Sequence, residues 1–452
     1  MKTNEMTRRA FLAATTTTAA VLYSARAQVN TARVVPRKLS PNEKMNIAGI
    51  GAGGKGLVDI MGCKDENIVA VCDVDWERGG EAAYRFPDAK KYTDFRKMLE
   101  EMDGEIDACT ISTPDHTHAP AAYMAMTMGK HVYVQKPLTH TLAEARMLTK
   151  LAVETGVVTQ MGNQGQCGDG VRELCEMIWS GVIGEVKEAH VWTDRPIWPQ
   201  GIPEPLPAED VPEHLDWELW VGPAPMRPYN KEYVPFKWRG WWDFGCGAIG
   251  DMACHNMNGA FMSLKLYEAP SFTVEVVQQD GMNAQTAPNN AIIKYSFSAR
   301  AGMGPVDMYW YDGKLLPARP EGVPEDEKIG DGDNGSIFIG SEGLLTTGTH
   351  AEGSRLMPDA KMADYTKPDP NIPRIPNGDP YRNWIDACKN GAKAASDFSL
   401  AGPLTEIANF GNIALHTGIK LEYDTAAMRI TNDEAANRLL TKEYRSGWEL
   451  PC

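Results

Sequence analysis

Short apolar runs alternate with longer amphipathic stretches between residues 45 and 161. The apolar runs have the length of strands and are Ile47–Ile50, Ile68–Cys72, Ile106–Ser112, His131–Val134 and Val157–Met161. Helix-length stretches such as Thr141–Thr155 separate them. Strands that alternate with helices are typical of βαβ units, so residues 44–165 are predicted to form a Rossmann domain with a doubly wound parallel sheet.

The pattern changes after residue 165. Glu173–Ser180 predicts a helix, Val186–Thr193 predicts a strand, and residues 380–420 return to helical character. Five β-rich runs lie between them: Ser271–Gln279, Ala291–Ser298, Val306–Tyr311, Ser336–Gly340 and Gly343–Thr347. Consecutive strands with few helices predict an open, largely antiparallel mixed sheet in a C-terminal α/β domain over residues 166–452.

Residues 194–242 form an insertion rich in proline and tryptophan. Ten of the 30 prolines lie between Pro196 and Pro235, and seven of the 12 tryptophans lie between Trp192 and Trp242. Proline excludes regular helix and central strand from residues 194–240. The segment is too long for a passive connection, so we expect it to cover a cleft.

Composition narrows the class of protein. The 452 residues are 43% hydrophobic and 23% charged, which is ordinary for a globular enzyme of two domains. The net charge of -15 disfavours nucleic-acid binding. No run approaches the roughly 18 apolar residues of a membrane helix, so we expect no membrane insertion. The nine cysteines lack zinc-like spacing, and we predict no metal site and no required disulfide.

The N-terminus has the three parts of an export signal. Arg8 and Arg9 are followed by a mildly apolar stretch to Tyr23 and by the A-x-A sequence Ala25–Ala27. This order predicts a twin-arginine signal over residues 1–27, followed by a polar arm over residues 28–43. We therefore expect export of the folded protein to the periplasm, or secretion.

A glycine turn follows the first predicted strand. Gly51, Gly53 and Gly56 fit G-x-G-x-x-G, in which the first glycine permits the tight turn and the last permits close helix–strand packing. The backbone at Ala52 and Gly53 can then approach a pyrophosphate at the helix N-terminus. A second register that starts at Gly49 is rejected, because its first glycine lies inside the strand.

Asp73 ends the second predicted strand, 22 residues after Gly51. A carboxylate there accepts the hydroxyl groups of an adenosine ribose and repels a 2′-phosphate, so NAD is expected rather than NADP. The alternative for Asp73 is a helix cap or a turn residue.

Two further motifs, T-P-D-H-T-H at residues 113–118 and Q-K-P at residues 135–137, resemble those of the Gfo/Idh/MocA oxidoreductase family. The Asp251/His255 pair and the strand at residues 337–343 extend the resemblance over nearly all of residues 45–425. One departure is Gln135, where the family usually has Glu. The resemblance implies binding of NAD(H) or NADP(H), action on sugars, cyclitols or polyols, and dimers or tetramers built through the open sheet.

The resemblance also implies the roles of several residues. Lys136 corresponds to the active-site lysine, and His118 is structural or near the cofactor. Contacts to the cofactor are expected at Thr113, Pro114, His118, Gln135, Asn163 and Gln164. The last two follow the last Rossmann strand and are expected on the nicotinamide or substrate side. The H-x-H sequence at residues 116–118 is not a metal site, because no third ligand is suitably spaced.

Lys136, Asp251 and His255 form the predicted catalytic group. The ammonium of Lys136 can stabilise alkoxide character during hydride transfer. Asp251 and His255 are spaced i, i+4 and share a helix face. His255 can accept the hydroxyl proton, while Asp251 can orient the imidazole or hold a substrate hydroxyl. The alternative is a buried histidine beside a helix-capping aspartate.

Arg239, Trp241 and Asp243 are the predicted substrate contacts, since they stand just before Asp251. Aromatic faces pack against sugar C–H groups, and Arg and Asp bind hydroxyls. The alternative for the tryptophans is core packing.

Three functions fit the sequence. The first is an NAD-dependent oxidoreductase acting on a sugar, glycoside or cyclitol hydroxyl. The second is an NAD-dependent glycosidase that works by transient oxidation and elimination. The third, ranked last because Lys136 and His255 are present, is a non-enzymatic sugar- or nucleotide-binding protein. Export favours a tightly held cofactor, because free NAD is scarce outside the cytoplasm.

Overall fold

The structure, a computed structural model, describes residues 35–452. The predicted export signal at residues 1–27 and the first part of the predicted arm lie outside the described residues. No helix of the described chain combines the length and the apolar composition that crossing a membrane requires.

The N-terminal sheet has six parallel strands in the order β3-β2-β1-β4-β5-β6. They are β1 (Asn46–Ile50), β2 (Asn67–Cys72), β3 (Lys90–Tyr92), β4 (Ala108–Ile111), β5 (His131–Val134) and β6 (Thr159–Met161). The predicted parallel sheet is confirmed. Strand β3 was not predicted, because its Lys-Lys-Tyr sequence is a half-exposed edge without an apolar run.

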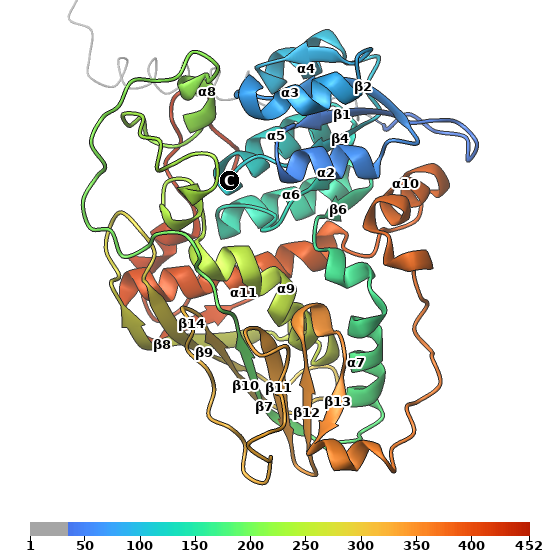
Figure 1. The fold of residues 1–452 in the computed structure, drawn as a ribbon, viewed down its shortest axis with the longest axis vertical. Helices are drawn as coiled ribbons and strands as arrows, with labels where there is room; N and C mark the ends of the chain where they lie inside the picture. The colour runs from blue at the N-terminus through green and yellow to red at the C-terminus, as the bar shows by residue number, and fades with distance from the viewer. Residues whose placement is uncertain (1–34) are drawn as a thin grey trace, which may run out of the picture. The chain divides into compact units, whose positions relative to one another are not determined.

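Helices cover both faces of this sheet (Figure 1). They are α2 (Lys55–Gly62), α3 (Trp76–Arg85), α4 (Phe95–Glu101), α5 (Asp115–Thr127) and α6 (Leu142–Thr155). The predicted helix Thr141–Thr155 is confirmed as α6. It begins with a capping box between Thr141 and Glu144 and ends at Gly156, whose φ is 73°.

The second sheet has nine strands in the order β13-β12-β11-β7-β10-β9-β8-β14-β15. They are β7 (Val186–Trp192), β8 (Ser271–Asp280), β9 (Asn290–Phe297), β10 (Val306–Tyr311), β11 (Gly335–Gly340), β12 (Leu344–Thr347), β13 (Arg355–Met357), β14 (Leu421–Asp424) and β15 (Arg429–Ile430). Only β7 and β10 pair in parallel, so the predicted open, largely antiparallel mixed sheet is confirmed. The short strands β13, β14 and β15 were not predicted.

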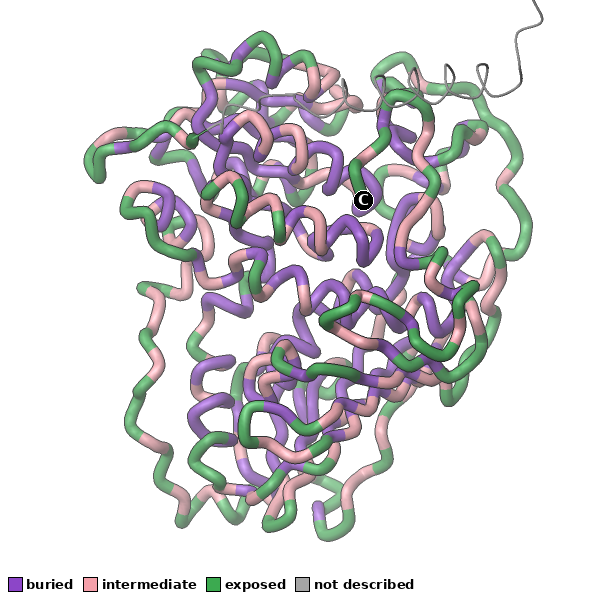
Figure 2. Tube along the Cα trace, turned by 180° about the vertical axis from the view of Figure 1, so that it is seen from behind, coloured by how far each residue is buried: buried purple, intermediate pink, exposed green. Residues whose placement is uncertain are grey.

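One face of the second sheet packs against helices α9 (Gly247–Ser263) and α11 (Phe398–Thr417), and α7 (Asp169–Trp179) packs on α9. Met308 and Trp310 on β10 point to these helices and are fully buried, whereas Tyr309 between them is half-buried on the opposite face. Figure 2 shows this buried layer as a purple interior below the N-terminal sheet.

The C-terminal helices α10 (Pro380–Asn390) and α11 return to the N-terminal sheet. The N–H of Met161 on β6 donates to the carbonyl of Ser396 (2.9 Å), and the N–H of Phe398 donates to Oγ1 of Thr159 (3.0 Å). Helix α11 also packs along α6. Residues far apart in the chain therefore support one sheet.

The insertion at residues 194–242 is mostly irregular, but it contains the five-residue helix α8 (Trp217–Val221) and a 3-10 turn at Lys237–Gly240. The prediction that it holds no regular helix is wrong at α8. This helix fits into a proline-free stretch between Pro212 and Pro223, and Asp216 caps it by accepting the N–H of Leu219 (2.9 Å).

Candidate active site

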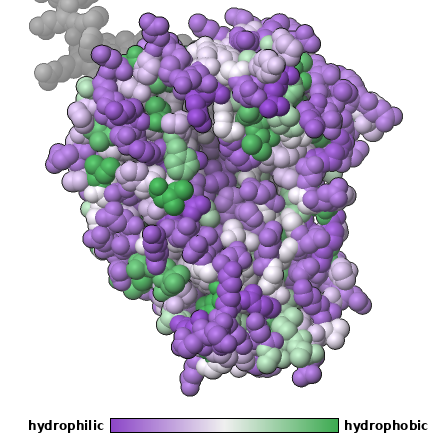
Figure 3. All heavy atoms as spheres, in the orientation of Figure 1, coloured by the Kyte–Doolittle hydropathy of each residue, from purple (hydrophilic) through white to green (hydrophobic). Residues whose placement is uncertain are grey.

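A cavity of about 460 Å³ lies at the carboxyl ends of β1, β2, β4 and β5. Ligands bind at these strand ends in doubly wound folds. The residues that follow each strand line one side of it, and the insertion and α9 line the other. Figure 3 shows a recess in the upper half of the protein surface, with apolar residues beside it.

The glycine turn forms the floor of the cavity between β1 and α2. Gly51 has a φ of 78°, and a Cβ on it would lie 2.7 Å from the carbonyl oxygen of Ser112. A Cβ on Gly56 would overlap the carbonyl oxygen of Gly51, which explains the close helix–strand packing. Gly51 and Gly53 line the cavity, while Ala52 is buried behind them. The residues present therefore fit a dinucleotide pyrophosphate at the N-terminus of α2.

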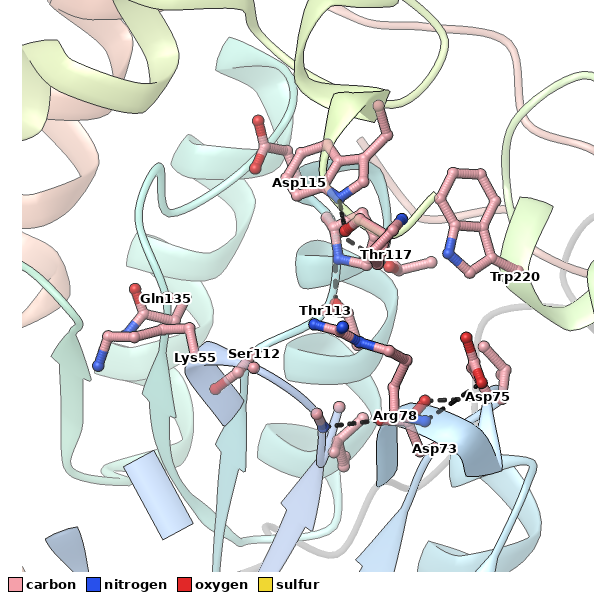
Figure 4. Close-up of a pocket in the computed structure, with 18 of the residues that line it drawn as sticks. Lys55, Asp73, Asp75, Arg78, Ser112, Thr113, Asp115, Thr117, Gln135 and Trp220 are labelled. Carbon is pink, nitrogen blue, oxygen red and sulfur yellow. Dashed lines mark hydrogen bonds between the residues drawn. The ribbon is translucent and has the colours of Figure 1, made fainter. Parts of the chain in front are cut away.

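Asp73 lies at the end of β2 and holds the glycine turn. Its carboxylate accepts the N–H groups of Ala52 (2.7 Å), Gly53 (3.0 Å) and Asp75 (2.9 Å). Burial raises the pKa of Asp73, and these three hydrogen bonds oppose the shift. A carboxylate has about four acceptor sites, so one remains for a ribose hydroxyl. Arg78 on α3, which the sequence reasoning missed, lines the same end of the cavity (Figure 4).

We expect Asp73→Ala to narrow the preference for NAD over NADP by at least tenfold. The variant removes the charge that repels a 2′-phosphate and leaves Arg78 free to pair with that phosphate. Dissociation constants for both cofactors, measured by titration, test this expectation. Adding Arg78→Ala to the variant should remove the gained affinity for NADP, and equal affinities in the unmutated protein would contradict the role of Asp73.

The other predicted cofactor contacts divide into two groups. Thr113, Pro114, Gln135 and Gln164 line the cavity. His118 does not, so its assignment as a cofactor contact is corrected. Its ring nitrogens lie 2.8 Å from the carbonyl oxygens of Pro137 and Thr113, and burial lowers the pKa of His118 to about 4. The His118 side chain therefore links the turn at Thr113 to the turn at Pro137, behind the cavity.

Asn163 also lies outside the lining of the cavity. It is buried, and both atoms of its amide have no hydrogen-bond partner within the described chain. Leaving a buried amide without hydrogen bonds is unfavourable. The amide of Asn163, beside Gln164 in the chain, therefore has unused capacity to donate and accept hydrogen bonds.

Lys136, Asp251 and Arg239 form one charged group. The Nζ of Lys136 lies 2.9 Å from Oδ1 of Asp251 and donates to its carbonyl oxygen (2.6 Å), and Nε of Arg239 lies 3.0 Å from the same Oδ1. Burial alone would raise the pKa of Asp251, but these two cations outweigh burial and hold it below its ordinary value. Asp251 therefore orients Lys136. The alternative in which it orients the imidazole of His255 is not seen.

His255 lines the cavity from α9. Burial and the charge of Lys136 lower the pKa of His255 well below its ordinary value, so the ring is neutral at physiological pH. Its Nδ1 atom has no partner among the residues that the structure describes. His350, which has a φ of 59°, packs edge to face on it with ring centres 4.8 Å apart. A neutral imidazole whose Nδ1 has no partner in the described chain can accept the hydrogen of a substrate hydroxyl, although the lowered pKa weakens it as a base.

Asp115 is a lining residue that the sequence reasoning did not select. It opens α5, and its Oδ2 accepts the N–H of Cys246 (3.1 Å). Burial raises the pKa of Asp115 to about 7, although the charges of Arg239 and Lys136 lower it. Its place in the T-P-D-H-T-H turn was the available signal, because a turn after a Rossmann strand faces the cleft.

Of the predicted substrate contacts, only Arg239 lines the cavity. Trp241 is almost fully buried in the aromatic core of the insertion, and Asp243 pairs with Arg227 (3.1 Å). Neither residue lines the cavity, and Trp241 follows the core-packing alternative given for the tryptophans, whereas Asp243 is part-exposed in an ion pair. Trp220 and Trp238 line the cavity instead, and the guanidinium of Arg239 lies 4.3 Å from the ring centre of Trp238.

The insertion is fastened to the loop that follows β2. The N–H of Asp216 donates to the carbonyl of Val74 (2.8 Å), and the N–H of Trp76 donates to that of His214 (3.1 Å). The His214 ring also contacts the carboxylates of Asp75 (2.9 Å) and Glu77 (2.8 Å). We call these contacts the clasp. The insertion thus covers the Asp73 end of the cavity, as expected from its length.

Fold and site together define a Rossmann-type dinucleotide-binding protein in which a lysine after β5 and a histidine on α9 line the same cavity. Residues 44–163 match "Oxidoreductase family, NAD-binding Rossmann fold", and residues 177–299 and 337–450 match "Oxidoreductase family, C-terminal alpha/beta domain". The chain belongs to the Gfo/Idh/MocA oxidoreductase family.

Two curated relatives match parts of the chain. A 4-carboxy-2-hydroxymuconate-6-semialdehyde dehydrogenase of Sphingobium sp. is 34% identical over 122 residues, 26% of this chain and 38% of the relative. An inositol 2-dehydrogenase/D-chiro-inositol 3-dehydrogenase of Lacticaseibacillus casei is 30% identical over 155 residues, 33% of this chain and 44% of the relative. The chain thus matches less than half the length of either relative.

Solved structures share the fold over more of the chain. An inositol dehydrogenase homolog from Azotobacter vinelandii, in complex with NADH and myo-inositol, has a TM-score of 0.54 and 16% identity, and the match covers 85% of this chain and 99% of that one. An aldose-aldose oxidoreductase from Caulobacter crescentus, in complex with glycerol, has a TM-score of 0.56 and 12% identity over 84% of this chain and all of that one.

Proposed function

We propose that this protein is an NAD-dependent oxidoreductase that oxidises a hydroxyl group of a sugar, glycoside or cyclitol. One observation carries the proposal: a single cavity joins the glycine turn and Asp73 to Lys136 and His255. The NAD-binding description of the family and the inositol dehydrogenases among its relatives support the cofactor and the substrate class.

The chain supplies the groups that alcohol oxidation needs. The glycine turn and Asp73 would hold NAD, which would supply the acceptor for the hydride of the substrate carbon. His255 accepts the hydroxyl proton on its neutral imidazole. The ammonium of Lys136, held by Asp251, stabilises the negative charge that develops on the substrate oxygen. Arg239 and Trp238 face the substrate side, where a guanidinium and an aromatic face suit a polyol.

The proposal is tested by incubating purified protein with NAD and a panel of sugars, glycosides and inositols. NADH fluorescence and mass spectrometry of the products are followed together. We expect a keto product from at least one member of the panel. If no substrate gives a keto product, while the protein binds NAD, the oxidoreductase proposal fails.

Asp115 supports a second candidate, the NAD-dependent glycosidase. Elimination after transient oxidation needs a further proton-transfer group, and a carboxyl with a pKa of about 7 in the same cavity is suited to that task. The same panel distinguishes the two candidates. Free aglycone without net NADH favours the glycosidase, and accumulated keto-sugar favours the oxidoreductase.

We also propose that the protein is exported and carries its cofactor with it. The proposal of export, to the periplasm or beyond, rests on the sequence of residues 1–27, and the clasp supports slow cofactor release. We expect protein purified from the periplasm to contain NAD(H), which mass spectrometry of the denatured protein detects. Periplasmic protein that is empty of dinucleotide would contradict this expectation.

Weakening the clasp should speed cofactor release. We expect His214→Ala to raise the off-rate of NAD about fivefold, the effect of losing about 1 kcal/mol in a part-exposed hydrogen bond to Asp75. Stopped-flow displacement of bound NADH measures the rate. Lys231→Ala is the matched control, because Lys231 belongs to the insertion and pairs with Glu209 (3.5 Å) outside the cavity. An unchanged off-rate in His214→Ala would remove the clasp from cofactor retention.

The open face of the second sheet supports a homo-oligomer, a dimer or tetramer. On this face the ring of His190 stacks on Tyr309 with ring centres 5.0 Å apart, and Tyr311 lies beside them. The half-buried rings of His190 and Tyr309 on this face are suited to pairing with a second copy. Light scattering of the purified protein tests the oligomeric state.

A further inference from the structure

Asp59, in the middle of α2, is fully buried. A buried carboxylate is unfavourable unless donors satisfy it. The Lys55 ammonium and the Tyr381 hydroxyl (2.8 Å) both bind Oδ1 of Asp59. The hydroxyl of Ser112 (2.7 Å) and Nε2 of Gln135 (2.9 Å) both donate to Oδ2. We call these five residues the Asp59 network.

Three of the four donors line the cofactor cavity, namely Lys55, Ser112 and Gln135. Figure 4 shows them on the side of the cavity opposite Asp75 and Trp220. The fourth donor, Tyr381, reaches the network from α10, and its hydroxyl also accepts a hydrogen bond from Lys55 (2.9 Å). Asp59 therefore does not line the cavity itself, but its carboxylate positions three side chains that line it.

The Gln135 amide is held in one orientation. Its Nε2 donates to Asp59, and its Oε1 accepts the N–H of Lys136 (3.4 Å). A Cβ on Gly162 would overlap this amide, so the side chain is enclosed on its far side. An amide supplies both the donor and the acceptor that this position needs. A carboxylate at residue 135 would face the carboxylate of Asp59, and two negative charges at that distance repel each other.

We propose that Asp59 is a positioning residue that holds Gln135 and Ser112 against the cofactor and that requires an amide at position 135. The negative charge of the Asp59 network lies on Asp59 of α2. The side chain of Gln135 supplies a hydrogen-bond donor to it. The effect on catalysis rests on the proposed role of Lys136, which Gln135 touches. The effect on cofactor binding is independent of that role.

A reciprocal exchange tests the proposal, with the dissociation constant for NAD as the main readout. Gln135→Glu should weaken NAD binding about tenfold, because it places two carboxylates in contact. The double variant Asp59→Asn/Gln135→Glu should return to within about threefold of the unmutated protein. The amide of Asn at position 59 can donate to the new carboxylate and to Ser112, while its oxygen still accepts from Lys55 and Tyr381.

Glu66→Gln is the matched control, because Glu66 is another buried carboxylate, contacts Lys389 of α10 (2.7 Å) and lies outside the cavity. It should leave NAD affinity unchanged even where it lowers the melting temperature. Recovery in the double variant separates positioning from simple loss of stability, because a second destabilising change would not restore binding.

The proposal is overturned if Gln135→Glu binds NAD like the unmutated protein, or if the folded double variant binds no better than Gln135→Glu. If Gln135→Glu does not fold, Gln135→Met removes the donor without adding charge, and unchanged NAD affinity in that variant overturns the proposal equally. Unmutated protein that binds no NAD would instead contradict the proposed function. Normal binding with a failed exchange contradicts only the assignment of Asp59.

Discussion

Lys136→Ala should lower turnover about 10²-fold or more while NAD still binds. The variant removes the ammonium that Asp251 holds in the cavity, so the developing charge on the substrate oxygen loses its stabilising partner. His255→Ala should cause a similar loss, because it removes the proton acceptor. Steady-state kinetics and cofactor titration, measured on the same preparations, check both expectations.

Lys130→Ala is the matched control for this experiment. Lys130 is buried and paired with Asp103 (2.8 Å), and it precedes β5, whereas Lys136 follows β5. The two lysines therefore flank β5 at opposite ends, and Lys136 lines the cavity whereas Lys130 does not. Lys130→Ala should affect stability but not turnover. Near-normal turnover in Lys136→Ala would remove that residue from the mechanism.

Gly56→Ala should abolish measurable NAD binding. The added Cβ would overlap the carbonyl oxygen of Gly51, and relief requires a shift of the backbone that forms the pyrophosphate site. We expect a loss of affinity of at least 10²-fold, measured by titration with NADH, together with a lower melting temperature.

Gly80→Ala supplies the comparison. Gly80 lies inside α3, and a Cβ there would meet nothing within 4 Å. Alanine is favoured over glycine in a helix by about 1 kcal/mol, so this variant should be slightly more stable and should bind NAD normally. If Gly56→Ala also bound NAD normally, the glycine turn would not be the pyrophosphate site.

The sequence predicts most of the fold because the central strands are buried on both faces. Each such strand must be a short apolar run, as at His131–Val134, and such runs are visible without the structure. Edge strands carry less information. Strand β3 reads Lys-Lys-Tyr, and its place in the sheet follows from its pairing with β2, not from its composition.

The sequence predicts the site residues whose positions depend on local geometry. It misses those whose roles depend on contacts between distant parts of the chain. The glycine turn follows from spacing alone. The i, i+4 rule correctly put Asp251 beside His255 on one helix face, but Lys136, 115 residues away, determines what Asp251 does. Asp59 was missed because one polar residue in an apolar helix looks like a solvated position until Tyr381 and Gln135 are seen against it.

The return of α10 and α11 to the N-terminal sheet has a consequence for the evolution and engineering of this chain. In the linear sequence, residues 44–165 resemble an independent nucleotide-binding domain. In space, β6 depends on Ser396 and Phe398, and the cavity depends on the insertion and on α9. An exchange of residues 44–165 alone would therefore remove the partners of Ser396 and Phe398 and separate the glycine turn from the residues of the insertion and α9 that line the cavity with it.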